Sequence, residues 1–325
     1  MIIVRFTSGL GNQMFQYSFY RLMKEKYKDT KVLADLTWFY ANNDHHGYEL
    51  ERIFGAGNLE IEEASKGQIY RATGQLPPLI QGPLAKKAVF LEGPVNRILR
   101  ERFNTTDRVN RIDQLDGPLS NKDTVNEAGE EINEVYDAVM NLDTGRDWYI
   151  TGFWIEEKYY KPGIDRIRQK LIFPDFTEGE NLKLAEKIAA TDSVSIHVRR
   201  GDYLSDTYSS MFKSLGRDYY EKTVKVMKER FKDPRFYIFS DDPEYIKTAF
   251  DWLDNKQIVD CNHGDDSYRD MQLMSLCRGN IIANSTFSQW GALLNKNEDH
   301  LVIYPSAYLR DEDTEEKSLK GWVRI

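Results

Sequence analysis

The chain has 325 residues, 41% of them hydrophobic and 30% charged, and a formal net charge of −8. This composition excludes a disordered chain and a membrane protein. The negative charge excludes nucleic acid as the main partner, because phosphate backbones are bound by concentrated basic surfaces. The length exceeds the roughly 100–200 residues of one ordinary domain, so we expect two domains, residues 1–150 and residues 151–325.

The first residues are read directly as a strand, without the basic and apolar segments of a signal peptide. No stretch of about 18 uninterrupted apolar residues predicts a membrane span. We therefore expect a cytoplasmic enzyme, and work at the inner membrane face stays open. The two cysteines, Cys261 and Cys277, lack metal-like spacing and are expected to be free thiols.

The first half opens in the manner of an α/β domain. The pattern predicts a strand at residues 2–6, a glycine turn at 7–11 and a helix at 12–28. Two further strands are predicted at residues 31–36 and 148–151. Signals weaken over residues 55–148, which we interpret as helices and loops that elaborate this domain.

The second half alternates strands and helices. Strands are predicted at residues 193–198, 235–240, 256–260, 280–283 and 301–304, and helices near 218–232, 243–253, 266–277 and 287–295. Such alternation predicts a parallel, doubly wound sheet. Ligands bind such sheets at the carboxyl ends of the strands.

Two adjacent arginines stand where one of these strands should end, in the segment HVRRGDY at 197–203. Because side chains alternate along a strand, Arg199 and Arg200 cannot both face a ligand. We expect one to bind an anion through its planar fork and the other to hold the strand, for example through Asp202. The alternative is a surface ion-pair cluster.

Two further segments combine strand ends with helix starts. Ser285 and Thr286 follow an apolar strand and begin a helix, whose free amides attract anions, although simple helix capping is the alternative. Residues 8–13 form a glycine turn that would let the backbone approach a ligand, with plain turn geometry as the alternative.

Together these segments have a specific resemblance. SGLGNQMFQY (8–17), HVRRGDY (197–203) and NSTFSQWGA (284–292) resemble the signature segments of the bacterial α-1,2-fucosyltransferases, glycosyltransferase family 11. YITGFWIEEKYY (149–160) is similar to a fourth. Gln289, Gly279 and Ile155 depart from the family pattern, where Trp, His and Gln are expected.

The resemblance implies a GT-B fold, in which two Rossmann-like domains face a cleft. Residues 1–150 would bind the acceptor and residues 151–325 GDP-fucose. The implied catalytic residues are Arg199, Asn12 and Asp202. The implied donor-binding residues are Gly9, Gly11, His197, Arg199, Asp241, Asn284, Ser285, Thr286 and Phe287.

In the implied reaction, L-fucose moves with inversion from GDP-β-L-fucose to the 2-hydroxyl of a galactoside, on an oligosaccharide or glycolipid. Negative charge grows on the β-phosphate, and arginine, hydroxyls and a helix start would stabilise it without a metal. The proton acceptor stays open among Asp202, Asp206, Glu157 and His46.

Acceptor contacts are expected from one acid and three aromatic residues, with packing in the core as the alternative for the aromatics. These residues are Asp35, Trp38, Phe153 and Trp154. Two other function classes stay open: an α-1,6- or protein O-fucosyltransferase, and a non-catalytic carbohydrate-binding protein.

Overall fold

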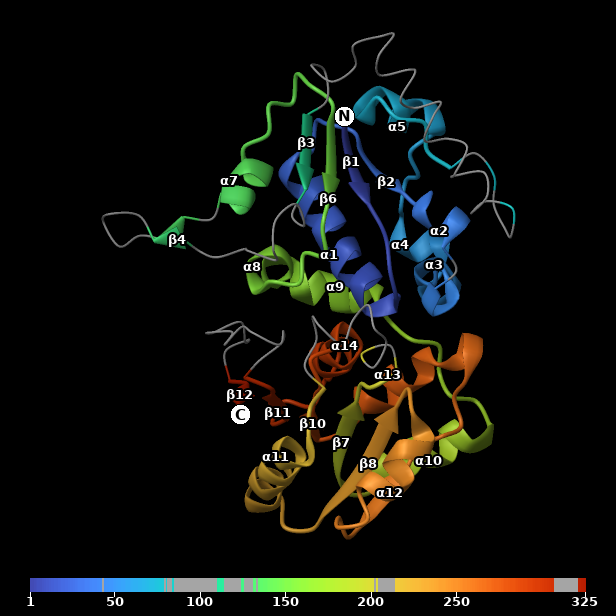
Figure 1. The fold of residues 1–325 in the computed structure, drawn as a ribbon, viewed down its shortest axis with the longest axis vertical. Coiled ribbons are helices and arrows are strands. Elements are labelled where there is room, and N and C mark those ends of the chain that lie inside the picture. The colour runs from blue at the N-terminus through green and yellow to red at the C-terminus, as the bar shows by residue number, and fades with distance from the viewer. Residues whose placement is uncertain are drawn as a thin grey trace. The chain divides into compact units, whose positions relative to one another are not determined.

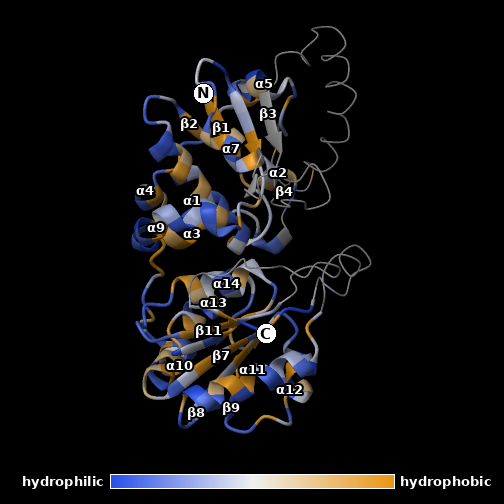
Figure 2. Ribbon diagram, turned by 90° about the vertical axis from the view of Figure 1, so that its left-hand side faces the viewer, coloured by the Kyte–Doolittle hydropathy of each residue, from blue (hydrophilic) through white to orange (hydrophobic). Residues whose placement is uncertain are grey.

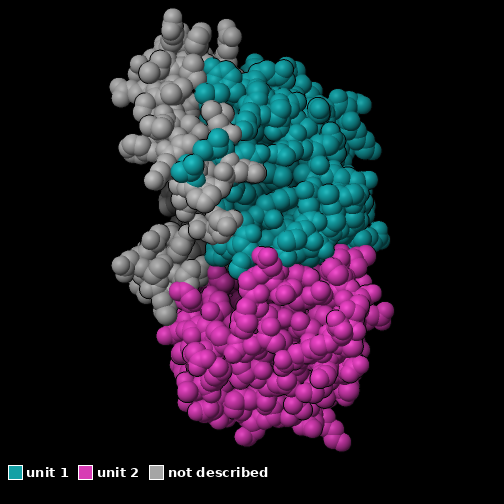
Figure 3. All heavy atoms as spheres, turned by 90° about the vertical axis from the view of Figure 1, so that its right-hand side faces the viewer, with its two compact units in different colours: residues 1–170 teal, residues 171–325 magenta. Residues whose placement is uncertain are grey.

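The computed structural model describes residues 1–42, 44–78, 80, 84, 110–113, 124–125, 131–132, 134–201, 203, 214–306 and 321–325. The chain forms two compact units, residues 1–170 and residues 171–325 (Figure 3). This division falls after Lys170, whereas the sequence analysis placed it after residue 150. Each unit has its own parallel sheet and its own core.

The first unit is built on four parallel strands in the order β2-β1-β6-β3 (Figure 1). The strands are β2 (Val32–Asp35), β1 (Ile2–Arg5), β6 (Trp148–Thr151) and β3 (Asn110–Asp113). The chain leaves β1 toward β2 on one side and later returns to place β6 on the other. This reversal of strand order lies beside the carboxyl end of β1, the position where such sheets bind ligands.

Helices cover both faces of this sheet. Ile3, Leu33 and Tyr149 pack with Ile69 of α5 on one face, and α1 contacts β1 and β2. The continuous apolar strands follow from this double covering. The helices are α1 (Leu10–Lys26), α2 (Trp38–Ala41), α3 (Leu50–Phe54), α4 (Ala56–Leu59), α5 (Lys66–Thr73), α7 (Glu134–Met140), α8 (Glu157–Tyr160) and α9 (Ile164–Lys170). Short 3₁₀ turns occupy η1 (Asp44–His46) and η3 (Lys161–Gly163), and β4 (Thr124–Val125) pairs antiparallel with β5 (Glu131–Ile132).

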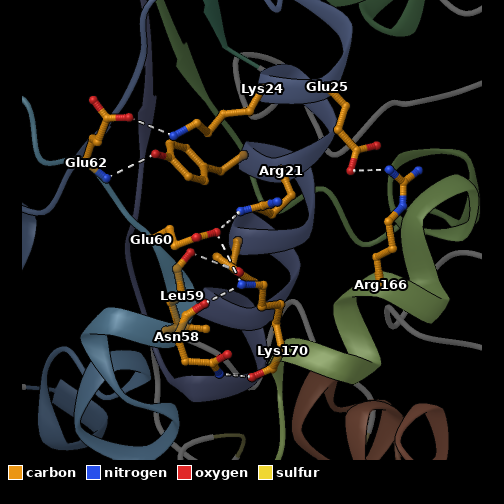
Figure 4. Close-up of polar contacts among 11 residues, drawn as sticks. Arg21, Lys24, Glu25, Asn58, Leu59, Glu60, Glu62, Arg166 and Lys170 are labelled. Atoms are coloured by element: carbon orange, nitrogen blue, oxygen red, sulfur yellow. Dashed lines mark hydrogen bonds and ion pairs between the residues drawn. The ribbon is translucent and has the colours of Figure 1, made fainter.

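Polar contacts tie α9 to the rest of the first unit (Figure 4). Arg166 pairs with Glu25 of α1 at 2.8 Å. Lys170 donates from Nζ to the Asn58 carbonyl at 2.8 Å, and its own carbonyl accepts from Asn58 Nδ2 at 2.6 Å. Exposed ion pairs are weak individually, but the reciprocal bonds of Lys170 fix the end of the unit. Residues 151–170 therefore fold with the first sheet.

Trp154 anchors this same segment in the core. Its indole is fully buried and stacks on Phe19, with ring centroids 3.7 Å apart and an interplanar angle of 5°. The backbone of Trp154 is left-handed, with φ of 57°, which is unfavourable for a bulky residue. The burial of the indole between Phe19 and Tyr159 offsets that strain.

The second unit contains six parallel strands in the order β12-β11-β10-β7-β8-β9. They are β7 (Asp192–Val198), β8 (Pro234–Ser240), β9 (Lys256–Ile258), β10 (Gly279–Ile281), β11 (Leu301–Tyr304) and β12 (Val323–Arg324). The chain runs outward from β7 to β9 and then returns to place β10 on the other side of β7. A second reversal of strand order therefore lies between β7 and β10.

Two layers of helices cover this sheet. Residues of α11 and α12 pack on one face and residues of α10 and α13 on the other. Figure 2 shows the strands around β7 mainly in the hydrophobic colour. The helices are α10 (Gly179–Ala189), α11 (Arg217–Arg230), α12 (Pro243–Ala249), α13 (Tyr268–Met274) and α14 (Thr286–Leu293), with a 3₁₀ turn at η5 (Gly264–Asp266).

The structure confirms the expected α/β class, with one parallel sheet in each half. The expected strands of both halves are present, some with ends shifted by a residue or more. Helix α1 begins at Leu10 rather than Asn12, and α10 was not predicted. Much of the weak stretch at 55–148 lies outside the described residues. Cys261 and Cys277 are free thiols, as expected.

Trp154→Ala is expected to lower the free energy of unfolding by about 3 kcal/mol or more, because it removes a fully buried aromatic ring. Trp154→Phe keeps a ring against Phe19, so its free energy of unfolding should fall by clearly less. Urea denaturation followed by circular dichroism measures both. Equal stability of the alanine variant and the wild type would contradict the packing described.

Candidate active site

Three neighbouring strands of the second unit end at the same edge of the sheet. β7 lies between β8 and β10, all parallel, with Val198 paired to Ser240 and Ile196 to Ile281. Arg199 directly follows β7, Asp241 follows β8, and Asn284 lies just beyond β10. The three predicted segments of this half therefore meet at the reversal of strand order.

Arg199 is held at this edge by Asp241. Its Nη1 lies 3.1 Å from Asp241 Oδ2, and its guanidinium carbon lies 5.9 Å from the centre of the Tyr203 ring. The side chain is 20% exposed, so it is neither locked in the core nor loose on the surface. A guanidinium has five N–H donors in a planar fork, the geometry that binds an anion through two hydrogen bonds.

Arg200 has the structural role expected of the second arginine, with a different partner. Its Nε donates to Asp242 Oδ2 at 3.2 Å, and its guanidinium carbon lies 3.9 Å from the centre of the Tyr245 ring. Asp242 also caps α12 by accepting from the Tyr245 amide. The expected partner, Asp202, lies outside the described residues.

Asp241 also fixes the backbone of the arginine turn. Its two carboxylate oxygens accept from the amides of Arg200 at 2.9 Å and Gly201 at 3.0 Å. A Cβ at Gly201 would lie 3.0 Å from Asp241 Oδ2, so a larger residue would push the carboxylate away from the turn. The resemblance implied donor binding for Asp241, and its contacts within the chain also orient Arg199.

His197 is a buried, neutral group next to the arginine. Burial, and secondly the charge of Arg199, lowers the pKa of His197 to about 3. Its ring lies 5.8 Å from that of Phe287, between centroids, and among the described residues Nδ1 has no hydrogen-bond partner. A neutral imidazole with an open nitrogen can bind a polar ligand atom.

The start of α14 lies at the same edge. Ser285 is the N-cap residue, yet its hydroxyl makes no capping hydrogen bond, so the capping alternative is wrong for this hydroxyl. Ser288 accepts the Ala283 amide instead, at 3.2 Å. The first amides of α14 have no partner within the helix, as at any helix start, and Thr286 and Phe287 beside them are half-buried.

The sequence analysis missed Asp270. It lies in the first turn of α13, which follows the loop from the carboxyl end of β9. Burial raises the pKa of Asp270 to about 7, although Asn262 donates to it at 2.7 Å. A carboxyl with so shifted a pKa is a candidate ligand contact, and the only signal in the sequence is an acid at the start of an apolar helix.

In the first unit, the glycine turn follows β1 at the carboxyl edge of its sheet. Gly9 is the N-cap residue of α1, and Gly11 is buried in the first helical turn. Asn12 is half-buried, and no described residue forms a hydrogen bond with its side chain. These three residues belong to the first unit, and the other predicted donor residues belong to the second.

Two buried glutamines of this segment escaped the sequence analysis. Gln13 donates to the carbonyls of Ser8 and Gly47, both at 2.8 Å, and accepts from the Glu49 amide at 2.9 Å. Gln16 accepts from the Thr7 amide at 2.9 Å and donates to the Gly152 carbonyl at 3.1 Å. The amide side chains in this polar run were the available signal.

The four predicted acceptor residues divide into two groups. Asp35 is buried, and its carboxylate accepts from the Thr37 amide and hydroxyl and from the Tyr149 hydroxyl at 2.6–2.8 Å. Trp154 packs in the core, so the core alternative fits it. Trp38 and Phe153 are half-buried and retain surface for a ligand.

The open candidates for the proton acceptor also separate. Glu157 forms an ion pair with Lys161. His46 is exposed, in a turn beside the start of α1. Asp202 and Asp206 lie outside the described residues. Of the two candidates that the structure describes, His46 is the more exposed.

The structure describes all three departures from the family pattern. Gly279 is the first residue of β10, where a Cβ would lie 3.0 Å from Met227 Sδ. It therefore accommodates α11 at the amino end of the strand and does not shape the edge with Arg199. Gln289 is buried in α14, and Ile155 is half-buried after β6.

Within the described ranges, no three His, Cys, Asp or Glu side chains gather in a way that could hold a metal ion. In the same part of the chain, no helix combines the length and apolar character required to cross a membrane.

Comparisons with known proteins identify the family of this chain. The model of glycosyl transferase family 11 matches residues 67–325. The O-antigen biosynthesis glycosyltransferase WbnK of Escherichia coli is 26% identical, over 98% of both chains. An α-1,2-colitosyltransferase of Escherichia coli is 27% identical, over 100% of this chain and 99% of its own. Mouse galactoside α-(1,2)-fucosyltransferase 1 is 27% identical, over 41% of this chain and 37% of its own.

The family match covers both the arginine turn after β7 and the start of α14, where an anionic leaving group can be bound. The chain belongs to glycosyl transferase family 11, the α-1,2-fucosyltransferase family, and is a glycosyltransferase.

Proposed function

We propose that this protein transfers L-fucose from GDP-β-L-fucose, with inversion and without a metal ion, to the 2-hydroxyl of a galactoside. The observation that carries the proposal is the meeting of Arg199 and the start of α14 at one reversal of strand order. This arrangement suits a diphosphate, which a planar guanidinium and free helix amides bind together.

The leaving group gains negative charge as its bond to the sugar breaks. Arg199 meets that charge from the end of β7, while Asp241 keeps the guanidinium in place at 3.1 Å. Donors fixed before the reaction stabilise the transition state more than donors that must reorganise. The positive charge and the amides that the protein supplies support a reaction without a metal.

His197 would contact the donor as a neutral group. Its pKa of about 3 keeps the imidazole uncharged at neutral pH. In this state one nitrogen donates and the other accepts. We assign it to the nucleotide or the sugar as a hydrogen-bonding partner, with Asn284, Ser285, Thr286 and Phe287 on the same edge.

The acceptor is assigned to the carboxyl edge of the first sheet. Asn12, Trp38 and Phe153 have accessible surface there, and aromatic faces suit the apolar side of galactose. An oligosaccharide or a glycolipid fits this proposal. The relative named for colitose transfer makes colitose the donor sugar to test against fucose.

Binding of GDP tests the donor class. GDP is expected to raise the melting temperature of the wild type, because a ligand of the native state stabilises it. UDP and ADP at the same concentration should produce smaller shifts. Transfer assays with GDP-fucose and GDP-colitose on a β-galactoside then identify the sugar. Equal shifts with all three nucleotides would overturn the donor assignment.

Arg199→Ala is expected to lower kcat by about 10²–10³, the typical loss when one transition-state donor is removed. Arg278→Ala is the matched control, because it removes an arginine–aspartate pair with Asp192 at the opposite edge of the same strands. The control should keep kcat within about twofold. Stopped assays with purified proteins measure both. Full activity of the Arg199 variant would refute the charge-stabilisation mechanism.

Excess EDTA is expected to leave the rate unchanged. Arg199 and the helix amides supply the positive potential that a divalent ion would otherwise provide. Initial rates before and after dialysis against EDTA, and after addition of Mg²⁺ or Mn²⁺, provide the measurement. Loss of activity that returns with metal would overturn the metal-free mechanism.

A further inference from the structure

A turn of unusual backbone geometry lies between α2 and α3. His45, His46 and Gly47 have φ of 55°, 70° and 73°, three consecutive left-handed residues. Glycine adopts this conformation readily, whereas two successive residues with side chains do so only when their surroundings hold them. The turn therefore needs an explanation from its contacts.

Gln13 supplies part of that restraint. From the first part of α1, it donates to the Gly47 carbonyl and accepts from the Glu49 amide. Its second N–H donates to the Ser8 carbonyl, so one buried side chain joins the glycine turn to the histidine turn. Glu49 is itself buried and pairs with Arg52 at 2.9 Å.

Packing on both sides completes the restraint. A Cβ at Gly9 would lie 3.1 Å from the Cβ of His45 and 3.2 Å from its Cγ. The histidine side chain therefore occupies the space that only glycine leaves at the start of α1. The Phe39 and Tyr48 rings, with centroids 5.4 Å apart, join the segments before and after the turn.

The side chain that this arrangement presents is that of His46. It is exposed, and among the described residues nothing forms a hydrogen bond or an ion pair with it. Because His45 packs at the start of α1, the turn lies at the carboxyl edge of the first sheet. The nearby Asn12 amide likewise has no hydrogen bond from a described residue.

We propose that the turn at residues 45–47 recognises the acceptor, with His46 as a contact to its sugar hydroxyls and Gln13 as the positioning residue. The proposal rests on the proposed function. An imidazole both donates and accepts hydrogen bonds, which suits a hydroxyl-rich ligand. A contact that needs no flexible loop loses less entropy when the sugar binds.

Steady-state kinetics with GDP-fucose and lactose test the proposal. His46→Ala should raise the KM for lactose about tenfold, the loss expected for a hydrogen bond to a ligand, and leave the KM for GDP-fucose within twofold. His300→Ala is the matched control, since His300 lies before β11 at the amino end of the other sheet. It should change neither constant.

Gln13→Leu should raise the KM for lactose in the same direction. If Gln13 acts through the turn, His46→Ala should raise the KM for lactose by a smaller factor in the Gln13→Leu background than in the wild type. An unchanged KM for lactose in His46→Ala, or equal changes in both KM values, would overturn the proposal. Fully additive effects would overturn the role of Gln13.

The proposed function can fail separately. If the wild type transfers no fucose to lactose, saturation-transfer NMR of lactose binding still compares the wild type with His46→Ala. Weaker lactose signals in the variant support the turn, and equal signals refute it.

Discussion

The contact between Asp241 and the turn after β7 is the interaction on which the candidate active site depends. One carboxylate binds the Arg199 side chain and the amides of Arg200 and Gly201. It lies at the end of β8, the strand paired with β7, so the sheet itself sets its position. Arg199 thereby acquires a defined direction although it is partly exposed. A solvent-exposed arginine without such a partner would lose that orientation to side-chain entropy.

The sheets of the two units have the same reversal of strand order. In each sheet the chain runs out to one side and returns to the other, and the segment after the first strand begins the site. In the second unit that segment carries charge, through Arg199. In the first unit it carries neutral amides, Asn12 and Gln13, beside a histidine turn. This difference is consistent with the proposed function, in which the donor is charged and the acceptor is an uncharged, hydroxyl-rich sugar.

The sequence alone predicts the α/β class, most strands and the arginine turn. The spacing of apolar residues, the ends of strands and the residue types are local properties of the sequence. The partner of Arg200 was not predictable, since Asp242 follows another strand, β8, and only the pairing of β7 with β8 brings it close. Trp154 and Asp35 were plausible acceptor contacts by residue type, and their burial became visible only with Phe19 and Tyr149 in place. The contacts of Gln13 could not be predicted, because its three partners come from two separate turns.

The contacts of residues 151–170 also determine where the chain can be cut so that its two halves can be produced separately. A cut after residue 150 would strip Trp154 from Phe19 and leave a bare aromatic surface in the first half, which invites aggregation. The second half would then begin with a segment whose aromatic side chains have lost the core in which they pack. A cut after Lys170 leaves the stacked rings and the reciprocal bonds with Asn58 inside one fragment.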